Sequence, residues 1–160
     1  MKKYLPLILI WISGIILHFL YDLTGRSWLV SLFAPINESV WEHYKLAFWP
    51  LLVCGIAMAA EKGAINMAPP VIFSLTHTAF TMFGINYLYT GALGVDNILA
   101  LDIVNFLVST AIGYWFLIRY ARYEYTMGTG ITAVASIVIL TLMLWWLTFN
   151  PANLPIFIEK

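Results

Sequence analysis

Charged side chains are scarce in this chain. Only 10% of its 160 residues are Asp, Glu, Lys or Arg, and eight basic residues balance eight acidic ones. A soluble domain carries about 25% charged residues, so the composition excludes an ordinary water-soluble domain. Without an excess of positive charge there is no basic surface for DNA or RNA, and we expect no nucleic-acid partner.

Cysteine and histidine are also rare. Cys54 is the single cysteine, which excludes an intrachain disulfide and a cysteine-rich metal site. The three histidines are His18, His43 and His77, so the last third of the chain has none, and the motif His-Glu-x-x-His is absent. A metal or catalytic centre therefore has to be assembled from dispersed residues.

Long apolar runs take the place of the missing charge, since 62% of the residues are hydrophobic. A helix of about 20 apolar residues crosses a bilayer, and five stretches reach roughly that length without the alternation of a membrane strand. They cover residues 4–21, 41–60, 69–89, 98–118 and 131–149. We predict an all-α bundle of five transmembrane helices, a single integral membrane domain over residues 1–160 in contact with the lipid bilayer.

The connection between the first two apolar stretches is unusual. Residues 22–40 include a short apolar piece at 28–33 and then Pro35. This piece is too short to cross a membrane, so we predict a re-entrant or interfacial segment. The segment delivers either Asn37 as the N-cap of the next helix or, because Ser39 and Glu42 form a capping-box pattern, Ser39.

Lysine and arginine are distributed unevenly between the two ends of the predicted bundle. The end that holds the N-terminus has Lys2, Lys3, Lys62, Arg119 and Arg122, and the other end has Arg26, Lys45 and Lys160. The positive-inside rule then predicts a cytoplasmic N-terminus and an extracytoplasmic C-terminus. Residues 1–21 are similar to a signal peptide but lack a small-residue cleavage site, so we expect a retained first span.

The other polar residues gather toward the outer half of the predicted bundle. Ionisable residues in lipid-embedded helices are costly and usually mark a site. Helical spacing gives four of the stretches one polar stripe each, and the simplest packing turns these stripes toward a shared interior. We predict that this interior binds an ion or substrate through His18, Asp22, Glu38, Ser39, Glu42, His43, Lys45, His77, Asp102 and Asn105. Five of them are of types that hold a divalent metal: His18, His43, His77, Glu42 and Asp102.

These residues also have structural explanations. Glu42 and Lys45 can neutralise each other at a helix end, and Glu38 near a helix N-terminus is favoured by the helix dipole. His18 and His43 can be neutral histidines bonded to a neighbouring helix. His77 and Asp102 are harder to explain in this way, because deep placement is costly without a partner.

Several segments of the sequence are similar to a known pattern. Residues 18–25 read HFLYDLTG, residues 32–46 read LFAPINESVWEHYKL, and YLYTG at 87–91 precedes Asp102-Ile103. The chain resembles a family of small polytopic bacterial membrane proteins of unknown function, typified by HFLYxxSG and LFxPxNESVWEHxKL. Thr24 stands where serine is commoner in that family and keeps a hydroxyl. The resemblance implies a location in a bacterial plasma membrane and implies no activity.

Three classes of function remain open. The His, Glu and Asp cluster favours binding or transport of a cation, a proton or a small polar solute. Ser39 and His43, one helical turn apart, also fit a metal-dependent hydrolase or transferase acting on a lipid-like substrate, loosely similar to alkaline ceramidases, although the late paired-histidine motif of those enzymes is absent. The third class is an accessory subunit that pairs with another membrane protein or a second copy. The one cofactor that these side chains suggest is a divalent metal.

Overall fold

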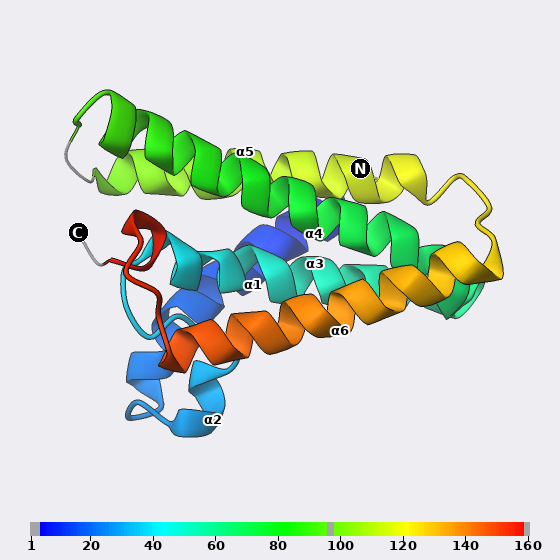
Figure 1. Cartoon of the computed structure of the whole chain (residues 1–160), viewed down its shortest axis with the longest axis horizontal. Helices are drawn as coiled ribbons and strands as arrows, with labels where there is room; N and C mark the ends of the chain where they lie inside the picture. Colours follow the sequence, from blue (N-terminus) through cyan, green and yellow to red (C-terminus); the bar gives the residue numbers. More distant parts are fainter. Residues whose placement is uncertain (1–3, 96–97, 159–160) are drawn as a thin grey trace.

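Five long helices make up most of the computed structural model, which describes residues 4–95 and 98–158. They are α1 (Leu5–Leu23), α3 (Val40–Lys62), α4 (Ala64–Asn86), α5 (Leu99–Tyr120) and α6 (Met127–Phe149), shown in Figure 1. Three short helical segments complete the fold: α2 (Trp28–Ser31), the π-helical η1 (Tyr87–Ala92) that continues α4, and η2 (Pro155–Phe157). No strand occurs among the described residues, and the all-α prediction is confirmed.

All five long helices are long and apolar enough to cross a membrane, as the sequence predicts. The largest difference lies in the third span, which was expected to begin at Pro69. Instead α4 begins at Ala64 and runs through Pro69 and Pro70. Proline removes a backbone hydrogen bond, but membrane helices tolerate it where neighbouring groups compensate. With η1 this span extends to Ala92.

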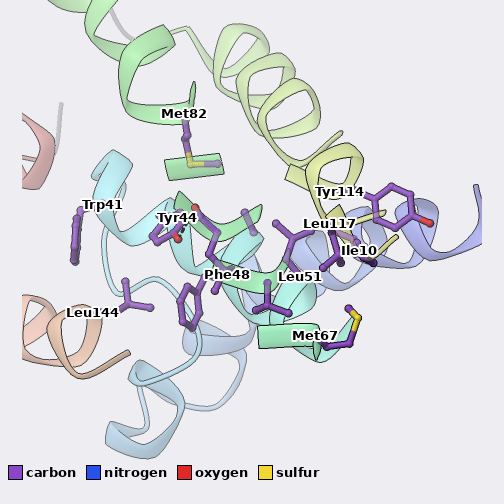
Figure 2. Close-up of a cluster of buried hydrophobic side chains, with 14 residues drawn as sticks. Ile10, Trp41, Tyr44, Phe48, Leu51, Met67, Met82, Tyr114, Leu117 and Leu144 are labelled. Atoms are coloured by element: carbon purple, nitrogen blue, oxygen red, sulfur yellow. Dashed lines mark hydrogen bonds between the residues drawn. The ribbon is translucent and has the colours of Figure 1, made fainter. Parts of the chain in front are cut away.

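The hydrophobic core lies between α3 and the helices around it. Of the most apolar window of each helix, 44% is buried in α3 but only 11% in α1 and 17% in α6. Helix α4 packs against α3, α5 and α6, and α1 packs against α3. Figure 2 shows the core side chains, which include Trp41, Tyr44, Phe48, Leu51, Met67, Met82, Leu117 and Leu144. The outer faces of α1 and α6 are apolar and suited to lipid contact.

The segment between α1 and α3 leaves and rejoins the bundle at the same end. Gly25 and Arg26 turn the chain after α1 with φ of 68° and 62°. Trp145 on α6 then donates its indole N–H to the Leu32 carbonyl oxygen, at 3.0 Å, and ties the segment to the bundle. In Figure 1, α2 lies at this end together with the start of α3 and the C-terminal segment.

Ser39 is the N-cap of α3. Its Oγ accepts a hydrogen bond from the Glu42 backbone N–H at 3.3 Å, so the second of the two predicted caps is correct. The expectation that Asn37 caps the helix is wrong, because Asn37 Oδ1 instead accepts from the Ser39 backbone N–H at 3.0 Å. The Asn37 side chain thereby orders the backbone just before the helix.

Not all of the basic residues used to predict the orientation of the chain are loop charges in the structure. Lys2, Lys3 and Lys160 lie outside the described residues. Lys45, counted as an outer charge, is fully buried beside Glu42 and is not a loop charge. Without Lys45, the excess of basic residues at the end that holds the start of α1 becomes larger, in the direction that the positive-inside rule uses.

Candidate metal centre

Three side chains with metal-binding atoms meet where α1 ends and α3 begins. His18 comes from the last turns of α1, Glu38 from the loop before α3, and His43 from the first turn of α3. Their ligand atoms lie within 4.8 Å of one another. The Ser39 cap and the Asn37 hydrogen bond fix the backbone on which Glu38 and His43 stand.

The spacing inside this cluster suits a single small cation. His43 Nε2 lies 3.2 Å from Glu38 Oε2. Two ligands at about 2.0–2.1 Å from a tetrahedral ion are themselves about 3.3 Å apart, so these two atoms already have the separation that zinc requires. The His18 and His43 rings lie close by, with centroids 5.3 Å apart.

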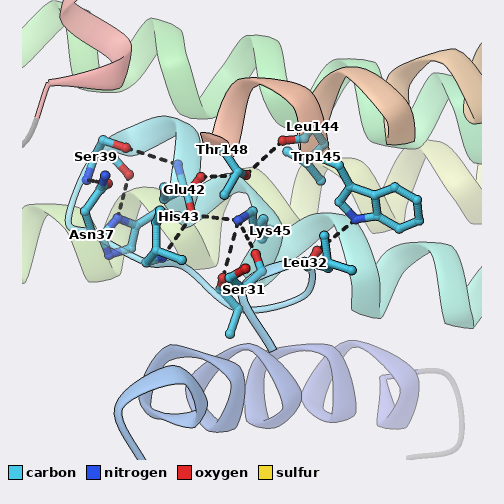
Figure 3. Close-up of polar contacts among 12 residues, drawn as sticks. Ser31, Leu32, Asn37, Ser39, Glu42, His43, Lys45, Leu144, Trp145 and Thr148 are labelled. Carbon is cyan, nitrogen blue, oxygen red and sulfur yellow. Dashed lines mark hydrogen bonds and ion pairs between the residues drawn. The ribbon is translucent and has the colours of Figure 1, made fainter. Parts of the chain in front are cut away.

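The hydrogen bonds of His43 leave its Nε2 atom facing Glu38. Nδ1 lies 3.0 Å from the Ser39 carbonyl oxygen, which can only accept, so Nδ1 carries a proton (Figure 3). When Nε2 is also protonated it donates to Glu38, and this bond lowers the pKa of the Glu38 carboxyl more strongly than partial burial raises it. Loss of the Nε2 proton leaves an imidazole lone pair beside a carboxylate, which is the form that binds a metal.

The hydrogen bonding of the His18 side chain is incomplete. Its Nδ1 is buried and has no hydrogen-bond partner among the described residues. Buried polar atoms without a partner are rare in folded proteins and costly. This buried nitrogen makes His18 a candidate to bind a ligand.

A small cavity adjoins the cluster between α3, α4 and α5. Its volume is about 30 Å³, and it is lined by Glu38, Val40, His43, Met82, Asn86, Asp102, Asn105 and Phe106. Asn105 is fixed in the wall, because its Nδ2 donates to the Met82 carbonyl oxygen at 2.9 Å and its Oδ1 accepts from Ser109 at 3.0 Å. The cavity therefore has a fixed polar group, Asn105, in its wall and shares Glu38 and His43 with the cluster.

Tyr89 holds the Asp102 side chain at this cavity. The Tyr89 hydroxyl donates to Asp102 Oδ1, and Asn86 Nδ2 donates to the same hydroxyl at 2.9 Å. Tyr89 belongs to η1, the π-helical continuation of α4, which shifts the register of its side chains relative to an α-helix. The π-helical turns thus bring a buried tyrosine to α5.

Next to the centre, Glu42 and Lys45 form a separate buried network, shown in Figure 3. Lys45 Nζ donates to Glu42 Oε2 at 2.6 Å and to the Ser31 carbonyl oxygen at 2.7 Å. Glu42 Oε2 also accepts from the Ile36 backbone N–H at 2.9 Å, while Oε1 accepts from the Thr148 hydroxyl at 3.0 Å. The network ties α3 to the preceding loop and to α6.

The comparisons with known proteins give a family. The model of the Family of unknown function (DUF6512) matches residues 2–160. The chain belongs to this family. No curated protein and no solved structure matches the chain. The expectation of an uncharacterised family is confirmed, while the family's motif and the bacterial origin stay predictions.

In this DUF6512 chain the predicted site residues separate into distinct groups. His18, Glu38 and His43 come together as predicted metal or ion-binding side chains. Asp102 and Asn105 line the adjoining cavity, and Ser39 serves as a helix cap. Glu42 and Lys45 pair with each other, which is the structural explanation considered for them.

Two predicted site residues do not join the cluster of His18, Glu38 and His43. Asp22 is exposed and forms a surface ion pair with Arg26, with Asp22 Oδ1 3.1 Å from Arg26 Nε. His77 stacks on Phe116 of α5 with ring centroids 3.8 Å apart, and its Nδ1 lies 2.7 Å from the Phe73 carbonyl oxygen. The shared interior therefore does not include His77, because packing turns this side chain toward Phe116 of α5.

Two residues of the site region, Tyr89 and Thr148, were missing from the predicted set, and a third, Glu38, was given a different role. Glu38 was a predicted ion-binding residue but not a predicted metal ligand, although it directly precedes the capping serine. Tyr89 lies in the segment YLYTG, whose resemblance to the family pattern was the available signal. Thr148 reaches Glu42 across 106 positions of sequence, and no local pattern reveals such a contact.

Proposed function

We propose that this protein is a multi-pass membrane protein that binds a divalent transition-metal ion through His18, Glu38 and His43. The main support is that ligand atoms from α1, from the loop before α3, and from α3 lie within 4.8 Å of one another. The unpartnered His18 Nδ1 and the 3.2 Å spacing between His43 and Glu38 support the same conclusion.

The ligand types favour zinc and similar ions. Two imidazoles suit Zn²⁺, Co²⁺, Ni²⁺ and Cu²⁺, whereas Mg²⁺ and Ca²⁺ prefer sets of oxygen ligands. Two histidines and one glutamate leave one position of a tetrahedral ion for water or another ligand. The adjoining cavity gives that position room.

The distribution of buried polar side chains favours a bound ion over one that crosses the membrane. Among the described residues, the buried polar side chains of α4 and α5 extend from Asn105 to Ser74 and Thr110, near the middle of these helices. Beyond them the contacts between helices are made by apolar residues such as Met67, Val71 and Leu117. This distribution supports access from one end of the bundle, the end that the positive-inside rule predicts to be extracytoplasmic.

Metal analysis of the purified protein tests this proposal. In detergent, the wild-type protein loaded with Zn²⁺ and desalted should retain equimolar zinc. His18→Ala and His43→Ala should each weaken zinc binding by about 100-fold or more, because each removes a ligand. His77→Ala is the matched control and should bind like the wild type, because His77 packs on Phe116 away from the centre.

Two results would overturn the proposal. One is a wild-type protein that retains no zinc, cobalt, nickel or copper. The other is zinc retained equally by the wild type and by the double variant His18→Ala, His43→Ala, which would place the ion elsewhere.

A further inference from the structure

The cavity beside the three candidate ligands has the size of a reaction site for water. A water molecule needs about 10–15 Å³ of such space, and the cavity offers about 30 Å³. Glu38 and His43 belong to both the cluster and the cavity wall, so an ion held by them would have a water-sized space beside it. Asp102 lines the same space from α5.

Asp102 is oriented as a base would be. The Tyr89 hydroxyl donates to its Oδ1, and Asn86 donates to that hydroxyl in turn. Tyr89 is only 7% exposed, so packing holds this chain of hydrogen bonds in place. A metal-held water, a carboxylate base and a group that orients the base are the parts of a hydrolytic site.

We propose that the centre is hydrolytic, that Asp102 is its general base, and that its substrate is a lipid carboxylic ester. This inference rests on the proposed metal binding. An ion held by His18, Glu38 and His43 would supply a polarised water. Asp102 would take a proton from this water, and the water oxygen would add to the ester carbonyl carbon. The bond from that carbon to the alcohol oxygen then breaks, and the departing oxygen takes the proton from Asp102. One ester and one water give one carboxylic acid and one alcohol.

The depth of the centre determines the substrate class. His18 lies about one turn before the end of α1, and His43 lies about one turn after the start of α3. One turn spans about 5 Å, so with α1 and α3 spanning a bilayer the centre would lie near the boundary between the hydrocarbon and the polar headgroups. The ester carbonyl groups of lipids lie at this boundary, with acyl chains on the hydrocarbon side. The apolar cavity residues Val40, Met82 and Phe106 suit such a neighbour.

The test follows the hydrolysis of p-nitrophenyl octanoate in detergent micelles by the zinc-loaded protein, with the zinc content of each sample measured in parallel. Asp102→Asn should lower kcat/KM by about 100-fold or more while zinc is retained. Tyr89→Phe, which removes the orienting bond, should lower it by about tenfold. The matched controls Glu124→Gln and Tyr87→Phe alter exposed side chains and should leave the rate unchanged.

The outcomes separate this inference from the proposed metal binding. Zinc retained by the wild type, with hydrolysis no faster than that of the His18→Ala variant, overturns the hydrolytic proposal and leaves the metal site standing. A wild type without a bound metal overturns both. Equal rates for Asp102→Asn and wild type overturn the role of Asp102. If Asp102→Asn loses zinc, Tyr89→Phe decides, because its zinc-bound form must still be slower than Tyr87→Phe.

Discussion

At the scale of single residues, the buried pair of Glu42 and Lys45 stands beside the candidate centre without belonging to it. Both side chains are almost fully buried, and a buried ion pair is tolerated only when further hydrogen bonds compensate for lost hydration. Here both Glu42 oxygens accept hydrogen bonds, from Ile36, Thr148 and Lys45. Since Ile36 lies two residues before Glu38, the pair also fixes the loop that carries a candidate ligand.

Replacing one member of this pair should destabilise the protein strongly. In Lys45→Met the Glu42 carboxylate loses its partner charge in a buried position, and we expect a loss of about 3–5 kcal/mol. Thermal unfolding of the purified protein in detergent measures the change. Arg26→Met removes a surface ion pair in which both side chains are 75% exposed, and it should leave the unfolding temperature nearly unchanged. Similar unfolding temperatures for the two variants would contradict a stabilising role for the Lys45 contacts.

At the scale of helices, glycine allows α5 to lie close to α4. A Cβ atom at Gly113 would lie 3.2 Å from the Ser74 carbonyl oxygen and would overlap the Thr78 hydroxyl. Thr78 donates to that same carbonyl at 2.8 Å, so its hydroxyl has a fixed place in the contact. Small residues permit such close helix contacts in membranes.

A methyl group at this contact should therefore separate α4 from α5. We expect Gly113→Ala to cost about 1–3 kcal/mol, the usual cost of overpacking. Gly84→Ala is the matched control on α4, because nothing lies within 4 Å of its added Cβ. The unfolding temperature in detergent should fall for Gly113→Ala and should not fall for Gly84→Ala. Equal stability of Gly113→Ala and wild type would show that the helices can move apart without cost.

The sequence predicts the helices well because an apolar run long enough to cross a bilayer has few other stable forms. The start of α4 could not be predicted in this way, since Pro69 and Pro70 indicate a boundary on local grounds and lie inside the helix. The cap of α3 was one of two alternatives, and the choice depends on which backbone N–H the Asn37 side-chain oxygen accepts from, which is that of Ser39. The cap is decided by local hydrogen bonds that both capping patterns allow in the sequence.

At the scale of the whole molecule, the candidate site could be predicted in part. Glu38 and His43 were both in the predicted set, but helical spacing put them on adjacent faces, and it is the loop before the Ser39 cap that brings their side chains to 3.2 Å. Spacing along α4 also predicts a stripe through Ser74 and His77, but the rotation of α4 about its axis depends on contacts such as Leu75 with the core. That rotation buries Ser74 and leaves His77 on Phe116. No pattern within one helix contains this information.

The orientation of the chain in the membrane is the prediction that belongs to the whole molecule. In a Cys54→Ser background, Thr24→Cys and Glu124→Cys place single exposed thiols at opposite ends of the bundle. If basic residues hold the other end in the cytoplasm, a membrane-impermeant maleimide added to intact cells labels Thr24→Cys, and it labels Glu124→Cys only after lysis. Labelling of Glu124→Cys in intact cells would reverse the orientation and place the candidate centre at the cytoplasmic surface. The hydrolysis test in detergent would be unaffected, because it needs no assigned side.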